Sequence, residues 1–372
     1  MDDMSRTVED HEALPAVGSA SQSPASGPNP FTGLPSEDDP LRVGRWSRER
    51  ITDWYRQRPW IVGCNYIPAY AVNQLEMWQP ETFDLAAIGA ELDLAASLGF
   101  NTLRVFLHDL LWTNPAVLLE HLDRFLDAAQ ARGIAIMPVF FDGVWLNYAH
   151  PGSQPAPIPG VHNSQWLQSP TAKAAVDPAQ WPRLEDYLGG VLDRFADDER
   201  VLVWDVYNEP GNESTITNAL PLLDAAFRWA RSIGVSQPLT SGIWDITAAF
   251  SQLNRFQLLA SDLLSFHHYG QVAELEWWIR SLRLLGRPMV CTEYMARPLG
   301  STFESHLPAL QAEDIGAISW GLVAGRTQTI HAWDSPRDAD EPDVWFHDIF
   351  RADGTPHDAD EVALIRHTIL GD

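Results

Sequence analysis

The chain alternates short apolar runs with longer amphipathic stretches, and this alternation limits its possible folds more than any other feature. Helix-like patterns occupy residues 83–99, 115–133 and 181–198, and several helical stretches end at Gly just before the next apolar run, as a C-cap leading into a strand requires. Eight runs rich in β-branched and aromatic residues are typical of buried strands: residues 60–66, 101–106, 134–140, 201–207, 238–244, 263–269, 288–294 and 315–321.

Eight strands separated by helices predict one α/β domain, a single (β/α)8 TIM barrel with long loops after the first, third, fourth and eighth strands. A doubly wound parallel sheet is the rival fold, but no Gly-rich phosphate-binding turn follows the first strand. We assign residues 41–372 to the barrel. Residues 1–40 are rich in Ser, Pro, Ala, Gly and acidic residues without apolar periodicity, so we expect a disordered or loosely attached N-terminal arm.

The charge balance limits the partners that the surface can attract. With 50 acidic and 25 basic residues the formal net charge is −25, which disfavours binding to nucleic acid or to anionic membranes. No stretch approaches the 18 apolar residues of a membrane span, and no secretory signal is visible. A cytoplasmic location is the simplest expectation, although export by another route or loss of a leader stays open, as does the oligomeric state.

The cysteines and histidines do not form a pattern for cross-linking or for metal. Cys64 and Cys291 both fall in predicted strands, and two cysteines make no disulfide framework, so we expect free buried thiols. Neither His-x-His on the first strand nor His-Glu-x-x-His occurs, so no metal and no cofactor are expected.

The fourth predicted strand stops at an unusual group, Asn208-Glu209-Pro210, where the proline ends the sheet ladder. Glu293 stands near the end of the seventh predicted strand, on the opposite side of such a barrel. The carboxyl ends of barrel strands meet at one mouth, so the two glutamates would face each other over a cavity. Such a pair suits glycosidic bond cleavage, in which one carboxyl protonates the leaving oxygen and the other attacks or activates water. Taken singly, each could be a residue beside a helix cap or a salt-bridge partner.

The Asn208-Glu209-Pro210 motif, combined with Glu293 on the seventh strand, resembles the clan of retaining (β/α)8 glycoside hydrolases. The resemblance is to the family 5 cellulase and mannanase group in particular, and it covers roughly residues 58–370. It implies that Glu209 is the general acid/base and that Glu293 is the nucleophile. It also implies a β-linked carbohydrate substrate, whose 2-hydroxyl Asn208 would bind.

The same resemblance assigns supporting roles at other strand ends. Arg104 matches an arginine beneath the nucleophile, where its charge would keep Glu293 ionised. His267 and Tyr269 match a His-x-Tyr group whose phenol hydrogen-bonds the nucleophile, and Trp320 matches a platform that stacks on the sugar. Each has a structural alternative: a plain ion pair for Arg104, a core histidine for His267 and a core ring for Trp320.

Two regions depart from the family pattern. The third strand ends with Asp142 and Trp145 where family 5 enzymes often place a histidine, so we expect both to take part in a different recognition of the sugar. The first loop, residues 65–83, carries amides, an acid and an indole that could bind an outer sugar, with Trp78 as the stacking ring. It could equally be a self-packed loop. Long loops over the mouth also favour a pocket, short oligosaccharides and exo action.

The sequence therefore predicts a retaining β-glycoside hydrolase that acts by double displacement. The prediction includes a carboxyl separation of roughly 5–5.5 Å and a raised pKa for Glu209. A transglycosylase with the same site and a non-catalytic sugar-binding barrel remain alternatives. The sugar and its linkage stay open, because loop contacts set them and the fold does not.

Overall fold

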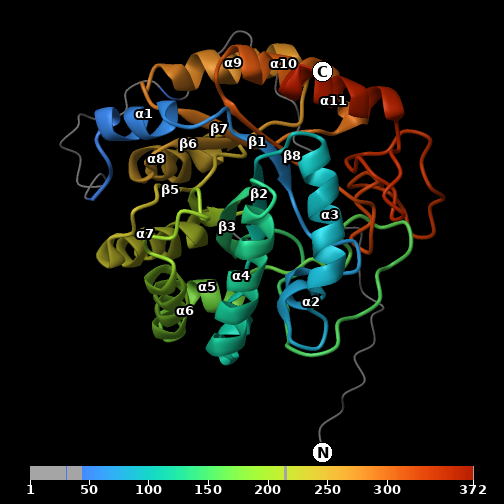
Figure 1. Ribbon diagram of the computed structural model, residues 1–372. Coiled ribbons are helices and arrows are strands. Elements are labelled where there is room, and N and C mark those ends of the chain that lie inside the picture. The colour runs from blue at the N-terminus through green and yellow to red at the C-terminus, as the bar shows by residue number, and fades with distance from the viewer. Residues whose placement is uncertain (1–30, 32–43, 213–215, 372) are drawn as a thin grey trace, which may run out of the picture.

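The computed structural model describes residues 31, 44–212 and 216–371 (Figure 1). The predicted N-terminal arm, residues 1–40, lies outside the described residues except for Phe31. That side chain is buried, and its ring lies 6.2 Å from the ring of Trp278.

The predicted barrel fold is confirmed. Eight strands pair in the order β5-β4-β3-β2-β1-β8-β7-β6, and every pairing is parallel. A parallel bridge between Ile243 and Phe266 joins the two edges, so the sheet closes on itself. The strands are β1 (Val62–Asn65), β2 (Thr102–Phe106), β3 (Ala135–Asp142), β4 (Trp204–Asn208), β5 (Leu239–Thr240), β6 (Leu264–His267), β7 (Met289–Glu293) and β8 (Gly316–Trp320).

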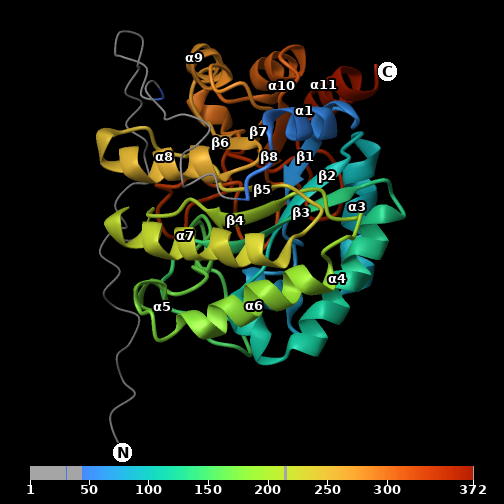
Figure 2. The ribbon, with the colours of Figure 1, turned by 90° about the vertical axis from the view of Figure 1, so that its left-hand side faces the viewer.

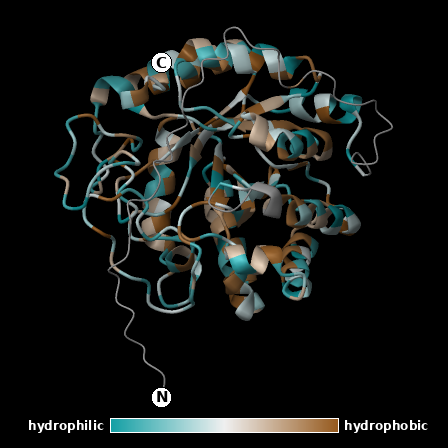
Figure 3. Cartoon of the chain, turned by 180° about the vertical axis from the view of Figure 1, so that it is seen from behind, coloured by the Kyte–Doolittle hydropathy of each residue, from teal (hydrophilic) through white to brown (hydrophobic). Residues whose placement is uncertain are grey.

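Helices surround the strands as an outer layer (Figure 2). Apolar and hydrophilic residues alternate along these helices (Figure 3), as expected when one helix face packs on a sheet and the other meets water. The α-helices are α1 (Arg48–Arg56), α2 (Gln74–Trp78), α3 (Leu85–Ser97), α4 (Pro115–Gln130), α5 (Ala172–Val176), α6 (Trp181–Arg194), α7 (Ile216–Ile233), α8 (Ser251–Ala260), α9 (Val272–Arg283), α10 (Phe303–Ala312) and α11 (Ala359–Leu370). Short 3-10 helices are η2 (Asp109–Thr113), η3 (Ala248–Phe250) and η4 (Arg297–Leu299).

Helix α1 closes the amino end of the barrel. Ile51 and Tyr55 of this helix pack in a separate apolar cluster with Met137, Val203 and other residues from the amino ends of the strands. The Tyr55 hydroxyl also donates to the Asp314 carbonyl at 3.0 Å. The carboxyl ends of the strands are therefore the end at which side chains can meet a ligand.

Parallel register brings polar side chains together at that end. Asn65 pairs with Arg104 on one side and with Trp320 on the other. Asp142 pairs with Asn208, and His267 pairs with Glu293 after a register shift in β6. The strand ends thus gather several of the residues that the sequence analysis selected.

Two other predictions are tested by the fold. Cys64 and Cys291 are buried free thiols, which confirms the expectation. Among the described residues, none of the helices has the length and apolar character needed to cross a membrane.

Candidate active site

Glu209 occupies a strained backbone position immediately after β4. Its φ of 41° lies in the left-handed region, which costs a non-glycine residue roughly 1–3 kcal/mol and persists only where neighbours fix it. Gly143 supplies part of that support, since its amide donates to the Asn208 carbonyl at 3.0 Å. A Cβ at Gly143 would meet the Glu209 carbonyl oxygen at 2.6 Å, so only glycine permits this approach.

The Glu209 carboxyl is buried between two polar partners. Its Oε1 lies 2.6 Å from His267 Nδ1, and its Oε2 accepts a hydrogen bond from Asn212 Nδ2 at 2.5 Å. Burial raises the pKa of Glu209 to about 7, although the Asn212 hydrogen bond opposes the shift. Burial lowers the pKa of His267 to about 4, so a neutral imidazole faces this carboxyl at neutral pH.

The Glu293 carboxyl has a different set of partners. Oε1 accepts from Arg104 Nη1 at 2.9 Å, and Oε2 accepts from the Tyr269 hydroxyl at 2.8 Å. Burial raises the pKa of Glu293 to about 7, and the charge of Glu209 adds to the rise, while His267, Arg104 and Tyr269 oppose it. Because the guanidinium and the phenol favour the ionised form, a single proton shared by the two carboxyls belongs on Glu209.

Arg104 joins four strands beneath the two glutamates. It is completely buried, and it donates to Asp205 Oδ2 through Nε at 3.0 Å and through Nη2 at 2.8 Å. Nη1 also donates to Asn65 Oδ1 at 2.8 Å, and Nη2 donates to Asn208 Oδ1 at 2.6 Å. Arg104 is therefore both a member of a buried ion pair and a hydrogen-bond donor to Glu293. The pair with Asp205 anchors the guanidinium that contacts Glu293.

Asp142 is the last residue of β3, and both of its carboxyl oxygens are hydrogen-bonded. Its carboxyl accepts from Asn208 Nδ2 at 2.9 Å and from Trp166 Nε1 at 2.7 Å. The residue is buried, and this burial raises the pKa of its carboxyl to about 7. Asp142 thus holds the amide of Asn208 in one orientation, and its part in recognising the sugar stays a prediction.

Aromatic rings form one flank of the mouth. Trp320 is half-buried, and its ring lies 5.7 Å from the rings of both Phe106 and Trp166. It therefore retains exposed ring surface on which a sugar could stack. Trp145 is buried in the same cluster with a φ of 68°, and its ring lies 5.8 Å from that of His162. The predicted contact of Trp145 with the sugar stays a prediction.

Trp78 requires a correction to the sequence analysis. Its side chain is wholly buried, its indole N–H donates to the Phe106 carbonyl at 2.8 Å, and its ring packs on Phe125. It belongs to the core and has no surface to offer a sugar. The rest of the first loop agrees: Asn73 accepts from the Glu76 amide at 3.0 Å as the N-cap of α2. The self-packed alternative is therefore the one that the structure supports.

Some residues at the site were missed by sequence reasoning. Trp333 lies 5.1 Å from the ring of Tyr269, and Asn212 binds the Glu209 carboxyl. Asp205, the anchor of Arg104, gave a readable signal, because a buried acid inside an apolar strand needs a buried cation. The sequence around Trp333 gave no such signal, because only the path of a long loop brings this residue to Tyr269.

A metal ion fits this arrangement poorly. Within the described parts of the chain, ligand atoms of Glu209, His267 and Glu293 all lie within 4.8 Å of one another. However, both carboxyls already accept hydrogen bonds, and the buried guanidinium of Arg104 lies 2.9 Å from Glu293. A second cation there would be repelled in a low-dielectric environment. The cluster is better suited to moving protons.

No family model and no curated protein sequence matches the chain. Solved structures do match it. An exo-beta-1,4-mannosidase from Opitutaceae bacterium strain TAV5 has a TM-score of 0.59 at 20% identity, over 84% of this chain. The match spans 60% of the length of that protein.

Two further structures are similar over comparable lengths. An endo-beta-1,4-mannanase from Thermotoga petrophila has a TM-score of 0.56 at 12% identity, covering 83% of this chain and 76% of that one. GH5_18 from Streptomyces cattleya, in complex with GlcNAc, has a TM-score of 0.56 at 17% identity, covering 84% and 80%. At 12–20% sequence identity, the similarity between this chain and these structures concerns the fold. The resemblance inferred from the strand-end motifs is thus confirmed for the fold, and the chain is a (β/α)8 barrel of the kind found in these structures.

Proposed function

We propose that the protein is a retaining β-glycoside hydrolase. The observation that carries the proposal is the pairing of Glu209 and Glu293 at the ends of opposite strands, with ligand atoms within 4.8 Å of each other. Retaining enzymes hold their two carboxyls about 5–5.5 Å apart, whereas inverting enzymes need about 6.5–9.5 Å to admit a water. A gap of at most 4.8 Å between one oxygen of each carboxyl agrees better with the shorter range, and this supports double displacement.

In the first step, Glu293 attacks the anomeric carbon while Glu209 gives its proton to the leaving oxygen. Arg104 and Tyr269 hydrogen-bond Glu293 and favour the charged form that attacks. Burial of Glu209, with its pKa near 7, keeps a proton available at neutral pH. The two carboxyls thus have opposite protonation states before the reaction begins.

In the second step, water releases the sugar from Glu293. Once Glu293 is bonded to the sugar it carries no charge, so the pKa of Glu209 falls and its carboxylate can accept a proton from water. The neutral imidazole of His267, 2.6 Å from Glu209, orients this carboxyl through both steps.

The sugar would lie between the carboxyls and the aromatic flank. Asn208, fixed by Arg104 and Asp142, would meet the 2-hydroxyl, and Trp320 would stack on the ring. Two of the structurally similar proteins are described as a β-mannosidase and a β-mannanase, so β-mannosides are the first substrates to test. Hydrolysis and transfer to an acceptor sugar share this site, and product analysis with added acceptor separates them.

The test is a panel of aryl β-glycosides and β-linked oligosaccharides with the wild type and Glu293→Ala. We expect the wild type to hydrolyse at least one glycoside and Glu293→Ala to lose at least a thousandfold in kcat. Glu276→Ala, which removes an exposed glutamate of α9, is the matched control and should be fully active. Binding without turnover would indicate a non-catalytic sugar-binding barrel, and an active Glu293→Ala would refute the assigned chemistry.

A further inference from the structure

The loops around the mouth are very unequal in length. Residues 66–84, 143–180 and 321–358 follow β1, β3 and β8, whereas residues 268–271 and 294–302 are the short connections after β6 and β7. Strands β3, β2, β1 and β8 are neighbours in the sheet, so the three long segments rise from one half of the barrel. We call these three segments the loop wall. Residues 143–180 (green) and 321–358 (red) of the loop wall lie side by side in Figure 1, beyond α2 and α3.

Backbone and side-chain hydrogen bonds join the β3 and β8 parts of the loop wall. Gln328 Nε2 donates to the Ile158 carbonyl at 2.6 Å, and Gln328 Oε1 accepts from the Gly160 amide at 3.0 Å. The Asn163 amide donates to the Thr327 carbonyl at 2.8 Å. Further contacts are His162 Nδ1 with the His331 carbonyl at 2.8 Å and the Asp338 amide with the Pro159 carbonyl at 2.7 Å.

The β1 part is bonded to both of the others. Asn73 Nδ2 donates to the Gln165 carbonyl at 3.1 Å, which ties it to the β3 part. The Arg326 amide donates to the Ala69 carbonyl at 2.9 Å, which ties the β8 part to the β1 part. A Cβ at Gly325 would meet Ala69 Cα at 2.4 Å, so the two backbones are in direct contact. The loop wall is therefore one connected structure and not a set of independent loops.

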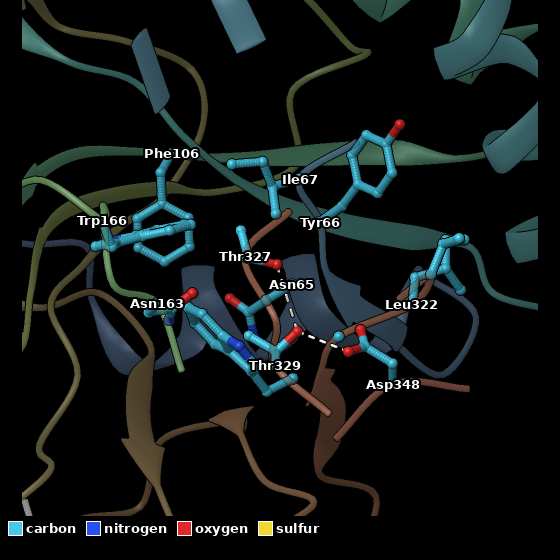
Figure 4. Close-up of a pocket in the computed structure, with 13 residues that line it drawn as sticks. Asn65, Tyr66, Ile67, Phe106, Asn163, Trp166, Leu322, Thr327, Thr329 and Asp348 are labelled. Carbon is cyan, nitrogen blue, oxygen red and sulfur yellow. Dashed lines mark hydrogen bonds between the residues drawn. The ribbon is translucent and has the colours of Figure 1, made fainter. Parts of the chain in front are cut away.

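A small cavity lies between the loop wall and Trp320 (Figure 4). Its volume of about 20 Å³ admits one water-sized group and not a sugar ring. In the cavity, Thr329 hydrogen-bonds both Thr327 and Asp348, whereas buried Asn163 Oδ1 has no hydrogen-bond partner among the described residues. The rings of Phe106, Trp166 and Trp320 and the side chain of Ile67 form much of the remaining lining.

The chemistry of the site fixes which end of a substrate meets the loop wall. The leaving oxygen must reach Glu209 at the end of β4, which lies next to β3 but across the barrel from β8, so the departing part of the chain extends away from the β1 and β8 parts of the loop wall. The sugar attacked by Glu293 lies on the other side, toward Trp320 and the cavity. Any sugar attached beyond it, toward the non-reducing end, would have to pass through the loop wall.

We propose that the protein is exo-acting and removes the terminal sugar from the non-reducing end of short β-linked oligosaccharides. The loop wall blocks further sugars, and the cavity takes one hydroxyl-bearing substituent of the terminal sugar, which donates to Asn163 Oδ1. This inference rests on the proposed glycoside hydrolase function and specifies the substrate class of the same site.

The first test follows β-linked oligosaccharides of two to six units, labelled at the reducing end and built from the sugar that the aryl glycoside panel selects. We expect monosaccharide from the earliest times and labelled products that shorten by one unit at a time. Labelled products of mixed length at the earliest times would overturn exo action and leave the hydrolase proposal intact. No cleavage of any glycoside would overturn both.

The second test uses aryl glycosides that each lack one hydroxyl. Apart from the 2-deoxy glycoside, whose missing hydroxyl is the one assigned to Asn208, one member of the series should lose about tenfold in wild-type kcat/KM beyond the others, and Asn163→Ala should abolish that difference. Asn163→Asp keeps an acceptor oxygen, so this variant should regain part of the difference between the deoxy glycosides. Gln311→Ala, an exposed amide of α10 that bonds the Thr368 carbonyl, is the control and should behave as the wild type. If every deoxy glycoside responds equally in the wild type and in Asn163→Ala, the role of the cavity is refuted.

Discussion

Arg104 donates to the carboxylate of Glu293 across 2.9 Å, and both side chains are buried. The guanidinium comes from β2 and the carboxylate from β7, so the barrel itself sets the distance. The same guanidinium holds Asn208 at 2.6 Å and is anchored by Asp205. One cation therefore fixes the charge of the proposed nucleophile and the orientation of the amide proposed to bind the sugar.

Arg104→Lys is expected to lower kcat by roughly a hundredfold while the protein still folds. Lysine keeps the positive charge, but a single ammonium cannot reach Glu293, Asn208 and Asp205 together. The pKa of Glu293 should rise, so the acidic limb of the pH profile should move to higher pH. Steady-state kinetics across pH measures both effects. Arg228→Lys, at an exposed position of α7, is the control, and a fully active Arg104→Lys would contradict the account.

Glu209→Ala should separate the two catalytic steps. Without the proton donor, glycosides with poor leaving groups should lose about 10²–10⁴-fold in kcat/KM, whereas dinitrophenyl glycosides should lose far less. With the activated substrates, the glycosyl-enzyme should accumulate because water lacks its base. Mass spectrometry of the intact protein during turnover detects this species. Equal losses for both leaving groups would show that Glu209 is not the acid.

The pH dependence of kcat/KM should be bell-shaped. Activity requires protonated Glu209, whose pKa is raised to about 7, so the basic limb should lie near pH 7. Once Glu209 holds its proton, its charge no longer raises the pKa of Glu293, so the acidic limb should lie below pH 7. A rate that keeps rising above pH 8 would contradict this assignment of acid and nucleophile.

Glu209→Gln should stabilise the protein at high pH. The pKa of Glu209 is about 7 in the folded protein and about 4.3 in an unfolded chain, so the folded state binds more protons between these values. Its contribution to stability is therefore lost as pH rises through this window. The variant should unfold at a higher temperature than the wild type at pH 8, by up to about 4 kcal/mol in unfolding free energy. At pH 4 the difference should vanish, and thermal unfolding at both pH values provides the test.

Trp320→Ala and Trp78→Phe should have opposite effects. Trp320 is half-buried beside the mouth, so its loss should raise KM by about tenfold with little change in melting temperature. Trp78 is buried and bonded to the Phe106 carbonyl, so its replacement should lower stability by about 1–3 kcal/mol and leave KM unchanged. A stability loss without a change in KM for Trp320→Ala, or a raised KM without a stability loss for Trp78→Phe, would contradict these assignments.

Much of the site could be predicted because a parallel barrel brings strand ends together whatever the loops do. Arg104, Glu209, Tyr269 and Glu293 each stand at or near a strand end, so their meeting follows from strand order and register. The predicted strand ends were enough to place them at one mouth, whereas the roles of Arg104 and Tyr269 came from the family resemblance.

The loop residues could not be placed in this way. An indole in a long loop can stack on a sugar or fill the core, and Trp78 fills the core because its loop folds against α4. Asp142 stands at a strand end, and Trp166, 24 positions later (166 − 142), returns to bond its carboxyl. Asn163 and Thr327 meet only through the folding of two separate loops. Specific contacts between distant segments decide these positions, and no local pattern encodes them.

The most direct test of the central claim is to trap the glycosyl-enzyme. A 2-deoxy-2-fluoro aryl glycoside of the accepted sugar slows both steps, and the second step is slowed enough for the intermediate to persist. Peptide mapping by mass spectrometry should then find one sugar per protein, attached to Glu293 and to no other residue. A label on Glu209 or on another side chain, or turnover of the parent glycoside with inversion at the anomeric carbon and no label, would contradict the account.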